Sequence, residues 1–382
     1  MKGSDQLTIY RVLFVTLMVG FLMFSGCAEE ETVDEVTHPE EEIVEEEEEK
    51  EEKKDEAIIL DEEIRADFYV GEFEWAAAHV WANNFSDYLH DRTDGAFQMD
   101  IYCYPDDTVY TVDPHEESEL EYLIMPGYWA QFYIPEVNIL SLHYLWPEDK
   151  PWKVLDWVVK NGETMSVLEE SYRQVGLVPL GIMFEGWMWL VANKPVETVD
   201  DLQGFNMRGI YGTTYAEHAR IQGATIVECT WDDVPSYLET GQIDGITHPN
   251  ITNIMDLAIN DIPDYFIQAN AEPYITIPAV RKDFFDGLPE EIQEEIRHWW
   301  ADAVIPLAEW INERDKKQME AILDDRPDIE VIEITGDEQN RFKESAIAAH
   351  EDLFEFGGTN AQALYEALVN DIEQAKQELG ID

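Results

Sequence analysis

The sequence predicts an α/β fold, because helical and strand-like patterns alternate along it. A helical apolar spacing at 74–89 is followed by a Gly turn and then by an alternating, strand-like pattern at 97–105. Helix, turn and strand in this order are typical of an α/β unit. The continuous apolar run at 176–184 has the length of a buried strand. The body at 58–382 is long enough for two lobes or two packed domains.

The N-terminus has the pattern of an exported lipoprotein. Residues 12–24 form an uncharged apolar run that is too short to span a bilayer comfortably. The run ends in Phe24-Ser25-Gly26-Cys27, which resembles the bacterial lipobox, with Phe24 where Leu is usual. We therefore expect a signal peptide at 1–26 and a lipid on Cys27 that anchors the chain outside the cytoplasm, in the periplasm or at the cell surface. The alternative is an uncleaved membrane anchor with an incidental cysteine.

An acidic segment follows. Residues 29–56 contain 17 acidic and 3 basic residues and almost no aromatic ones. Such a segment cannot bury enough apolar surface to offset its chain entropy, and its charges repel one another. We expect 27–57 to be a disordered tether; a cation-binding or partner-binding acidic tail is the alternative.

The rest of the chain carries most of the formal net charge of −59. This charge excludes nucleic acid as a natural partner and would repel anionic lipid headgroups. Abundant acidic side chains with few lysines also resemble the surface of a protein that works in strong brine, where salt screens the repulsion. We therefore expect a halophile-like surface.

Further elements follow in order along the body. We expect helices at 150–159, 163–175, 215–223, 232–240, from 288 toward 316 and beyond, and within 337–379, with strands at 205–210, 224–229 and 275–280. No nucleotide-binding glycine motif or zinc-type Cys/His spacing occurs, so no cofactor is expected. Cys103 and Cys229 lie in strand-like segments of different predicted lobes, which favours two thiols over a disulfide.

An ordered series of short motifs lies between residues 170 and 295. It comprises VGLVPLG at 175–181, NKPV at 193–196, VDDLQG at 199–204, Met207-Arg208, QGA at 222–224, WDDV at 231–234, LETGQIDG at 238–245 and LPEEIQ at 288–293. In this order and spacing, the set resembles the extracytoplasmic solute receptor of tripartite ATP-independent periplasmic (TRAP) transporters. A weaker similarity extends back to the first helix.

The resemblance implies a two-lobed α/β fold of the periplasmic-binding-protein type II kind, with a hinge and a long helix spanning both lobes. It places lobe I at 58–185 with 274–312, and lobe II at 186–273 with 313–382. Such a receptor closes on a solute and delivers it to a membrane permease, and it is not an enzyme.

Arg208 matches the family arginine that holds the solute's carboxylate. A guanidinium forms two parallel, charge-assisted hydrogen bonds to a carboxylate and stays protonated when it is desolvated. The alternative for Arg208 is a salt bridge to one of the chain's many acids. Trp231 falls where relatives often place an aromatic residue against the solute, or else it packs within its lobe. His248 stands where many relatives have Asn and could donate a hydrogen bond, or else it is structural.

The segment that opens lobe II supplies further ligand-binding candidates, namely Glu185, Trp187 and Met188; Tyr211 is another. Met188 replaces a second arginine of many relatives, which argues against sialic-type sugar acids. Together with Trp189, Tyr215, Tyr128 and Trp129, these residues predict a pocket rich in aromatic surface.

The expected solute is a monocarboxylate with an apolar or aromatic body. Relatives that bind their solute through a metal have an acidic residue where this chain has Thr247-His248, so no metal is expected. Two other functions stay open. One is a sensory or structural lipoprotein with the same fold, and the other is a surface hydrolase using His143 or His248, for which no catalytic motif is present.

Overall fold

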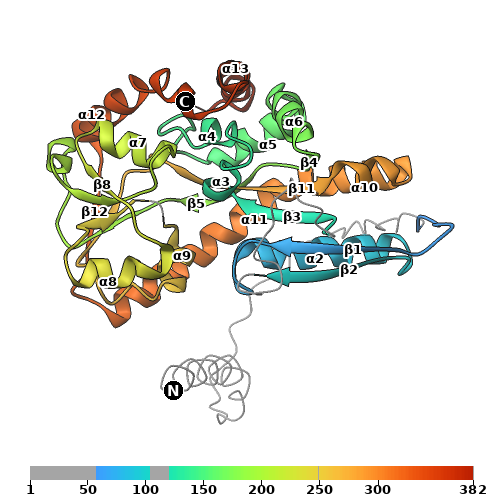
Figure 1. Ribbon diagram of the computed structural model, residues 1–382, viewed down its shortest axis with the longest axis horizontal. Helices are drawn as coiled ribbons and strands as arrows, with labels where there is room; N and C mark the ends of the chain where they lie inside the picture. Colours follow the sequence, from blue (N-terminus) through green and yellow to red (C-terminus); the bar gives the residue numbers. More distant parts are fainter. Residues whose placement is uncertain (1–56, 104–119, 248, 382) are drawn as a thin grey trace, which may run out of the picture. The chain divides into compact units, whose positions relative to one another are not determined.

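The computed structural model describes residues 57–103, 120–247 and 249–381. Helices and strands alternate throughout these segments, which confirms the α/β prediction (Figure 1). The predicted signal peptide, Cys27, the tether up to Glu56 and His248 lie outside the described residues. Among the helices that are described, none is both long and apolar enough to cross a membrane.

Within the described residues, the first sheet has six strands in the order β2-β1-β3-β11-β4, with β5 also paired to β11. Their bounds are β1 Ile64–Val70, β2 Phe97–Cys103, β3 Tyr122–Pro126, β4 Leu177–Pro179, β5 Met183–Trp187 and β11 Pro273–Arg281. Strand β1 runs parallel to β2 and β3, whereas β11 is antiparallel to its neighbours. The sequence analysis did not predict β1 or β3.

The second described sheet has six strands in the order β12-β10-β6-β9-β7-β8. Their bounds are β6 Leu190–Ala192, β7 Asn206–Arg208, β8 Thr225–Val227, β9 Gly245–Ile246, β10 Tyr265–Gln268 and β12 Glu330–Glu333. Strand β7 is parallel to both β8 and β9. The two sheets belong to the two lobes of the predicted fold. Cys103 ends a strand of the first sheet and Cys229 follows a strand of the second, and no disulfide joins them.

The helices cover the two sheets. Their bounds are α2 Ala77–Arg92, α3 Gly127–Ala130, α4 Val137–Leu140, α5 Pro151–Asn161, α6 Thr164–Gln174, α7 Thr214–Ile221, α8 Val234–Glu239, α9 Ile251–Asp256, α10 Lys282–Gly287, α11 Glu290–Asp325, α12 Gly336–Ile347 and α13 Ala361–Leu379. Three short 3-10 turns, η1 Val199–Leu202, η2 Trp231–Asp233 and η3 Asp352–Phe356, also lie within the described segments.

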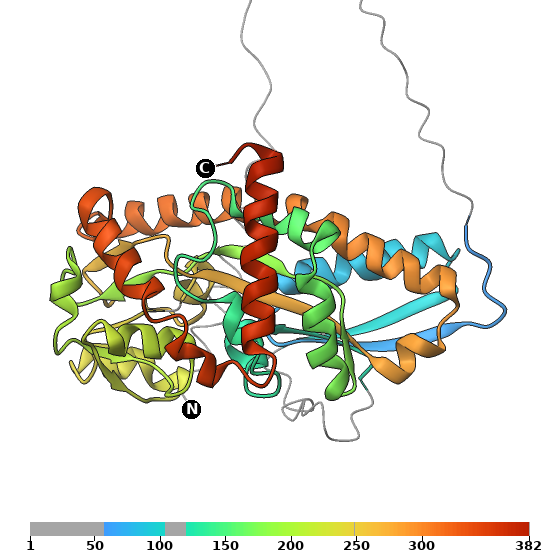
Figure 2. The same cartoon turned by 90° about the horizontal axis from the view of Figure 1, so that it is seen from above.

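Helix α11 is the predicted long helix. It has 36 residues and continues through Pro306. It packs on α2, α5 and β5 of the first lobe and on α9 of the second, and Figure 2 shows it running past both lobes. The chain also crosses between the sheets from β5 to β6 and from β10 to β11. The lobes are therefore joined by two strand crossings, by helix α11, and by the segment between α12, which packs in the second lobe, and α13, which packs in the first.

Helix α13 corrects part of the predicted lobe division. We expected 313–382 in lobe II, but α13 packs on α4, α5 and α6 of the first lobe. Its apolar face, with Leu364, Leu368 and Ile372, is buried in the core of that lobe. Helical periodicity located this helix but could not identify its packing partner. The remaining lobe boundaries stay predictions.

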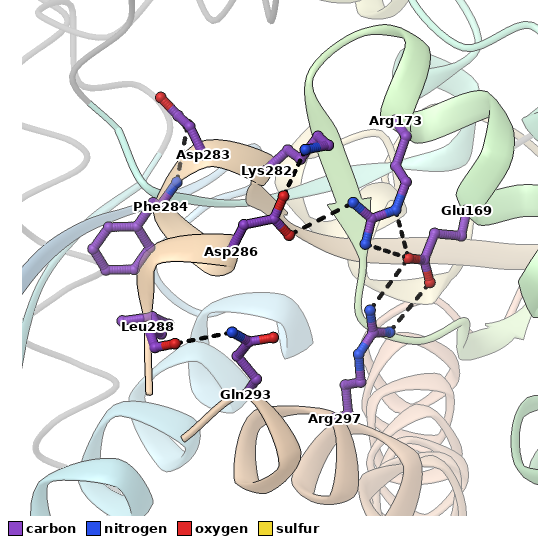
Figure 3. Close-up of polar contacts among 9 residues, drawn as sticks. All are labelled: Glu169, Arg173, Lys282, Asp283, Phe284, Asp286, Leu288, Gln293 and Arg297. Carbon is purple, nitrogen blue, oxygen red and sulfur yellow. Dashed lines mark hydrogen bonds and ion pairs between the residues drawn. The ribbon is translucent and has the colours of Figure 1, made fainter. Parts of the chain in front are cut away.

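A network of charged side chains links α6, α10 and α11 in the first lobe (Figure 3). Arg173 and Arg297 both reach the carboxylate of Glu169, at 2.6 and 3.3 Å. Arg173 also lies 3.6 Å from Asp286, which bonds Lys282. Each half-exposed ion pair contributes little to the free energy of folding. The main effect of the network is therefore to fix the relative positions of α6, α10 and α11.

Three buried histidines lie where the lobes meet. The backbone N–H of His143 donates to Nε2 of His218 on α7, at 3.2 Å, and the two rings stack at 4.1 Å. Nε2 of His350, in the segment before η3, lies 2.9 Å from the carbonyl of His143. Burial, with His143 and His350 nearby, holds the pKa of His218 well below its usual range. Burial likewise lowers the pKa of His350.

These lowered pKa values predict a loss of stability in mild acid. The unfolded chain binds protons near pH 6.5 whereas folded His218 stays neutral, so the free energy of unfolding falls as pH drops below about 6.5, with a slope that approaches about 1.4 kcal/mol per pH unit for this histidine. His350 contributes in the same direction. Denaturant unfolding between pH 7 and 5.5 measures this slope. His218→Gln keeps an acceptor for the His143 N–H. It should lower the slope, because the unfolded variant binds one proton fewer in mild acid. The exposed control His298→Gln should not change it, and equal slopes in wild type and His218→Gln would contradict the assignment.

Candidate functional site

A cavity of about 580 Å³ lies at the carboxyl ends of parallel strands from both lobes. The first lobe lines it with 71–73, which follow β1, and with α3, which follows β3. The second lobe lines it with Arg208 at the end of β7, with 228–231 after β8, and with Asn253 on α9. Open α/β sheets bind ligands beyond the carboxyl ends of their strands, because loops and helix starts converge there. This cavity is therefore the candidate binding site.

Arg208 is the positively charged group of the cavity. Strands β8 and β9 flank β7 on either side, so the residue that ends β7 is held rigidly, and Arg208 is only 4% exposed. Its Nη2 donates to the carbonyl of Cys229 at 3.3 Å, and its guanidinium carbon lies 5.5 Å from the centre of the Trp231 ring. A guanidinium favours the face of an indole ring. Arg208 and Trp231 thus form one unit in the cavity wall. The roles predicted for them in binding a solute stay predictions.

Aromatic side chains make up much of the wall. Phe73, Tyr128, Trp129 and Phe132 come from the first lobe, and Trp231 faces them from the second. Gly71 makes room for this wall, because a Cβ there would lie 3.1 Å from the ring of Trp129. Of the aromatic residues predicted for the pocket, Tyr128 and Trp129 line the cavity. Phe73 and Phe132 also line it, and they were not predicted.

Glu72 is a buried acidic residue that was not predicted from the sequence as part of the site. It is 5% exposed, lines the cavity from the first lobe, and accepts a hydrogen bond of 2.6 Å from the hydroxyl of Tyr274 on β11. Burial near carboxylates raises the pKa of Tyr274 well above its usual value, so the phenol stays protonated and donates. The alternation of Ile64, Ala66, Phe68 and Val70 marks β1 and could have shown that Glu72 follows a strand.

Asn253 adds a neutral polar group. It is 4% exposed, and its Oδ1 has no hydrogen-bond partner among the described residues. Its backbone N–H donates to the side chain of Asn250, which caps α9. Buried amide oxygens normally accept a hydrogen bond, so this atom can receive one from a ligand or a water. With Arg208, Glu72 and Asn253, the cavity can satisfy an anion, a cation and a neutral donor.

Four predicted ligand-binding residues do not line this cavity. Glu185 is a buried residue of β5 that lies near Arg314 of α11, and Trp187 packs edge-on against Phe184. Met188 lines a separate, smaller cavity of about 70 Å³. Tyr211 is 55% exposed, and its hydroxyl donates to the backbone of β8. Position near a motif in sequence did not determine which way these side chains face.

Two further predicted aromatic residues also lie elsewhere. Trp189 packs on Phe266 in the core of the second lobe. Tyr215 is buried on α7, in another core cluster of that lobe. Neither is among the residues that line the 580 Å³ cavity.

The described residues contain no group of three or more His, Cys, Asp or Glu side chains placed to hold a metal ion. His143, considered for a hydrolase, lies 3.2 Å from Glu272 within the buried histidine cluster and does not line the large cavity. The arrangement of the cavity suits reversible binding of a charged small molecule.

Known proteins share this architecture. UehA, the ectoine/5-hydroxyectoine-binding periplasmic protein of Ruegeria pomeroyi, is 22% identical over 81% of this chain and 91% of its own length. TeaA, the ectoine-binding periplasmic protein of Halomonas elongata, is 24% identical over 80% of this chain and 89% of its own. An open structure of a TRAP periplasmic solute-binding protein from Marinobacter aquaeolei superposes with a TM-score of 0.73 at 24% identity, covering 80% of this chain and all of that one.

The family comparison covers most of the chain. Residues 76–356 match the family described as bacterial extracellular solute-binding protein, family 7, or DctP. The match includes the Arg208 strand, the cavity walls contributed by α3 and α9, and all of α11. Members of this family are substrate-binding receptors and not enzymes. The chain belongs to family 7 of the bacterial extracellular solute-binding proteins, the receptors of TRAP transporters.

Proposed function

We propose that this receptor captures a small carboxylate through Arg208 and delivers it to a TRAP-type permease. The buried guanidinium at the end of β7, set against Trp231 and open to the cavity, is the observation that carries the proposal. A ligand carboxylate would form charge-assisted, bidentate hydrogen bonds there. The aromatic wall would cover the ligand's apolar part.

Glu72 narrows the class of carboxylate. A second carboxylate on the ligand would meet a buried like charge unless one of the two were protonated, so a C4-dicarboxylate fits poorly. A monocarboxylate that also carries a delocalised cation would satisfy both Arg208 and Glu72, and its cation would favour the aromatic faces. UehA and TeaA are named for binding ectoine, which supports testing that zwitterion first. An aromatic monocarboxylate is the second choice.

A thermal-shift and calorimetric screen of ectoine, succinate and phenylacetate tests this proposal. Ectoine should raise the unfolding temperature, and Arg208→Ala should weaken its binding about 100-fold, because charged hydrogen bonds at a buried site are lost. Glu72→Gln should weaken ectoine but not phenylacetate. The matched control Arg220→Ala, an exposed arginine of the same lobe, should bind as wild type. Tight succinate binding, or ligand stabilisation that survives Arg208→Ala, would contradict the proposed clamp.

We also propose that Cys27 carries the lipid that holds the receptor at the membrane surface, with 27–57 as its tether. Anchoring raises the effective concentration of the receptor near a permease. Cys27→Ser should move the protein from the membrane fraction to the soluble fraction of the cell envelope without changing its ligand affinity. A Cys27→Ser protein that stays with the membrane would favour an uncleaved anchor.

The acidic composition supports a working environment of high salt. With 83 acidic against 24 basic residues, self-repulsion should loosen the fold at low ionic strength. The midpoint of thermal unfolding is therefore expected to rise between about 0.05 and about 2 M NaCl, because at the higher concentration salt screens almost all of the repulsion between surface charges. A midpoint that stays constant or falls would contradict a halophilic role.

A further inference from the structure

A buried polar network behind the cavity joins three elements. Asn250 caps α9 by accepting from the Asn253 N–H at 2.9 Å, and its Nδ2 donates to the backbone carbonyl of Glu185 on β5 at 3.3 Å. From α11, Nη2 of Arg314 donates to the hydroxyl of Thr252. The first turn of α9, which carries Asn253 into the cavity, is thus held by the strand that crosses between the lobes and by the long helix.

Asp315, the next residue on α11, lies against the backbone of β5. Gly186 has φ of +90°, and a Cβ there would lie 2.7 Å from Oδ2 of Asp315. Oδ1 of Asp315 is 3.7 Å from Nη2 of Arg314, the nitrogen that donates to Thr252. Nε and Nη1 of Arg314 have no hydrogen-bond partner among the described residues, so an ionised Asp315 could draw the guanidinium toward itself and away from Thr252.

Among the described residues, the ionisable groups that interact with Arg314 are Glu185 on β5 and Asp315 on α11. The guanidinium carbon of Arg314 also lies 4.8 Å from the centre of the Trp310 ring. Burial, with Glu185 nearby, raises the pKa of Asp315 to about 7, against the opposing effect of Arg314. Burial also raises the pKa of Glu185. One arginine thus faces two carboxyl groups that resist being ionised together.

We propose that Arg314 is a positioning residue of the binding site, which holds Asn253 in the cavity through Thr252 and α9, and that Asp315 controls this hold. When Asp315 is neutral, Arg314 bonds Thr252 and α9 is fixed. When Asp315 is ionised, it attracts the guanidinium and the start of α9 loosens. The effect on ligand affinity rests on the function proposed above, whereas the hold on α9 does not depend on any ligand.

The first test needs no ligand. The α9 amides of Ile254 and Leu257 bond the carbonyls of Asn250 and Asn253, so their hydrogen exchange reports on this helix. In the full chain, Arg314→Gln should speed their exchange at least about tenfold at fixed pH, since a hydrogen bond from a charged donor is lost. Lys317→Gln, an exposed charge removal on the same helix, should not. Unchanged exchange in Arg314→Gln would overturn the proposal.

The second test measures ectoine affinity at pH 6 and pH 8. Asp315 passes from about nine-tenths protonated to about one-tenth over this range, so binding to wild type should weaken several-fold. The nearly isosteric variant Asp315→Asn should bind equally at both pH values. A pH dependence that persists in Asp315→Asn would overturn control by Asp315. If ectoine fails to bind at either pH while α9 exchange responds to Arg314→Gln, the proposed ligand is wrong and the positioning role stands.

Discussion

The burial of the Arg208 guanidinium constrains the rest of the pocket. Removing an ion from water costs several kcal/mol even after the protein relaxes, so a cation that is 4% exposed needs compensating groups close by. The Cys229 carbonyl and the Trp231 ring supply part of the compensation from neighbouring turns of the same lobe. A ligand carboxylate would supply more. Binding energy at this site thus depends on a charge that the fold has already desolvated and fixed at a strand end.

The two lobes divide the recognition between them. Arg208, Trp231 and Asn253 come from the second lobe, whereas Glu72 and most of the aromatic wall come from the first. A ligand that touches both sets gains most when the lobes hold it together, because each half alone leaves part of it in water. The chain passes between the lobes next to Gly186 and before β11, and α11 contacts both lobes. The residues proposed to recognise the ligand therefore lie at strand ends in both lobes, between the two parts of the fold.

Sequence patterns predicted the second lobe better than the first. Each βα unit from 199 to 240 follows a regular order of turn, strand and helix, so these elements could be predicted from the pattern, whereas the site positions of Arg208 and Trp231 came from the family resemblance. Strand β1 was missed, and Glu72 with it, although its alternating apolar residues mark a strand. Its pairing with β2 and β3, which are distant in sequence, could not be predicted from local pattern. Likewise, the apolar stripe of α13 predicted a helix but not its packing partner.

Glu185, Trp187 and Met188, at the start of lobe II, were predicted to bind the ligand, but none of them lines the large cavity. In β5 and the turn after it, Glu185 and Met188 are buried on either side of Gly186, which has a positive φ. Glu185 lies near Arg314 of α11, and its backbone carbonyl accepts a hydrogen bond from Asn250, the cap of α9. A buried carboxyl at this place is costly unless something uses it. Burial and the nearby Glu185 together raise the pKa of Asp315, so Glu185 supports the control of α9 that is proposed for Asp315.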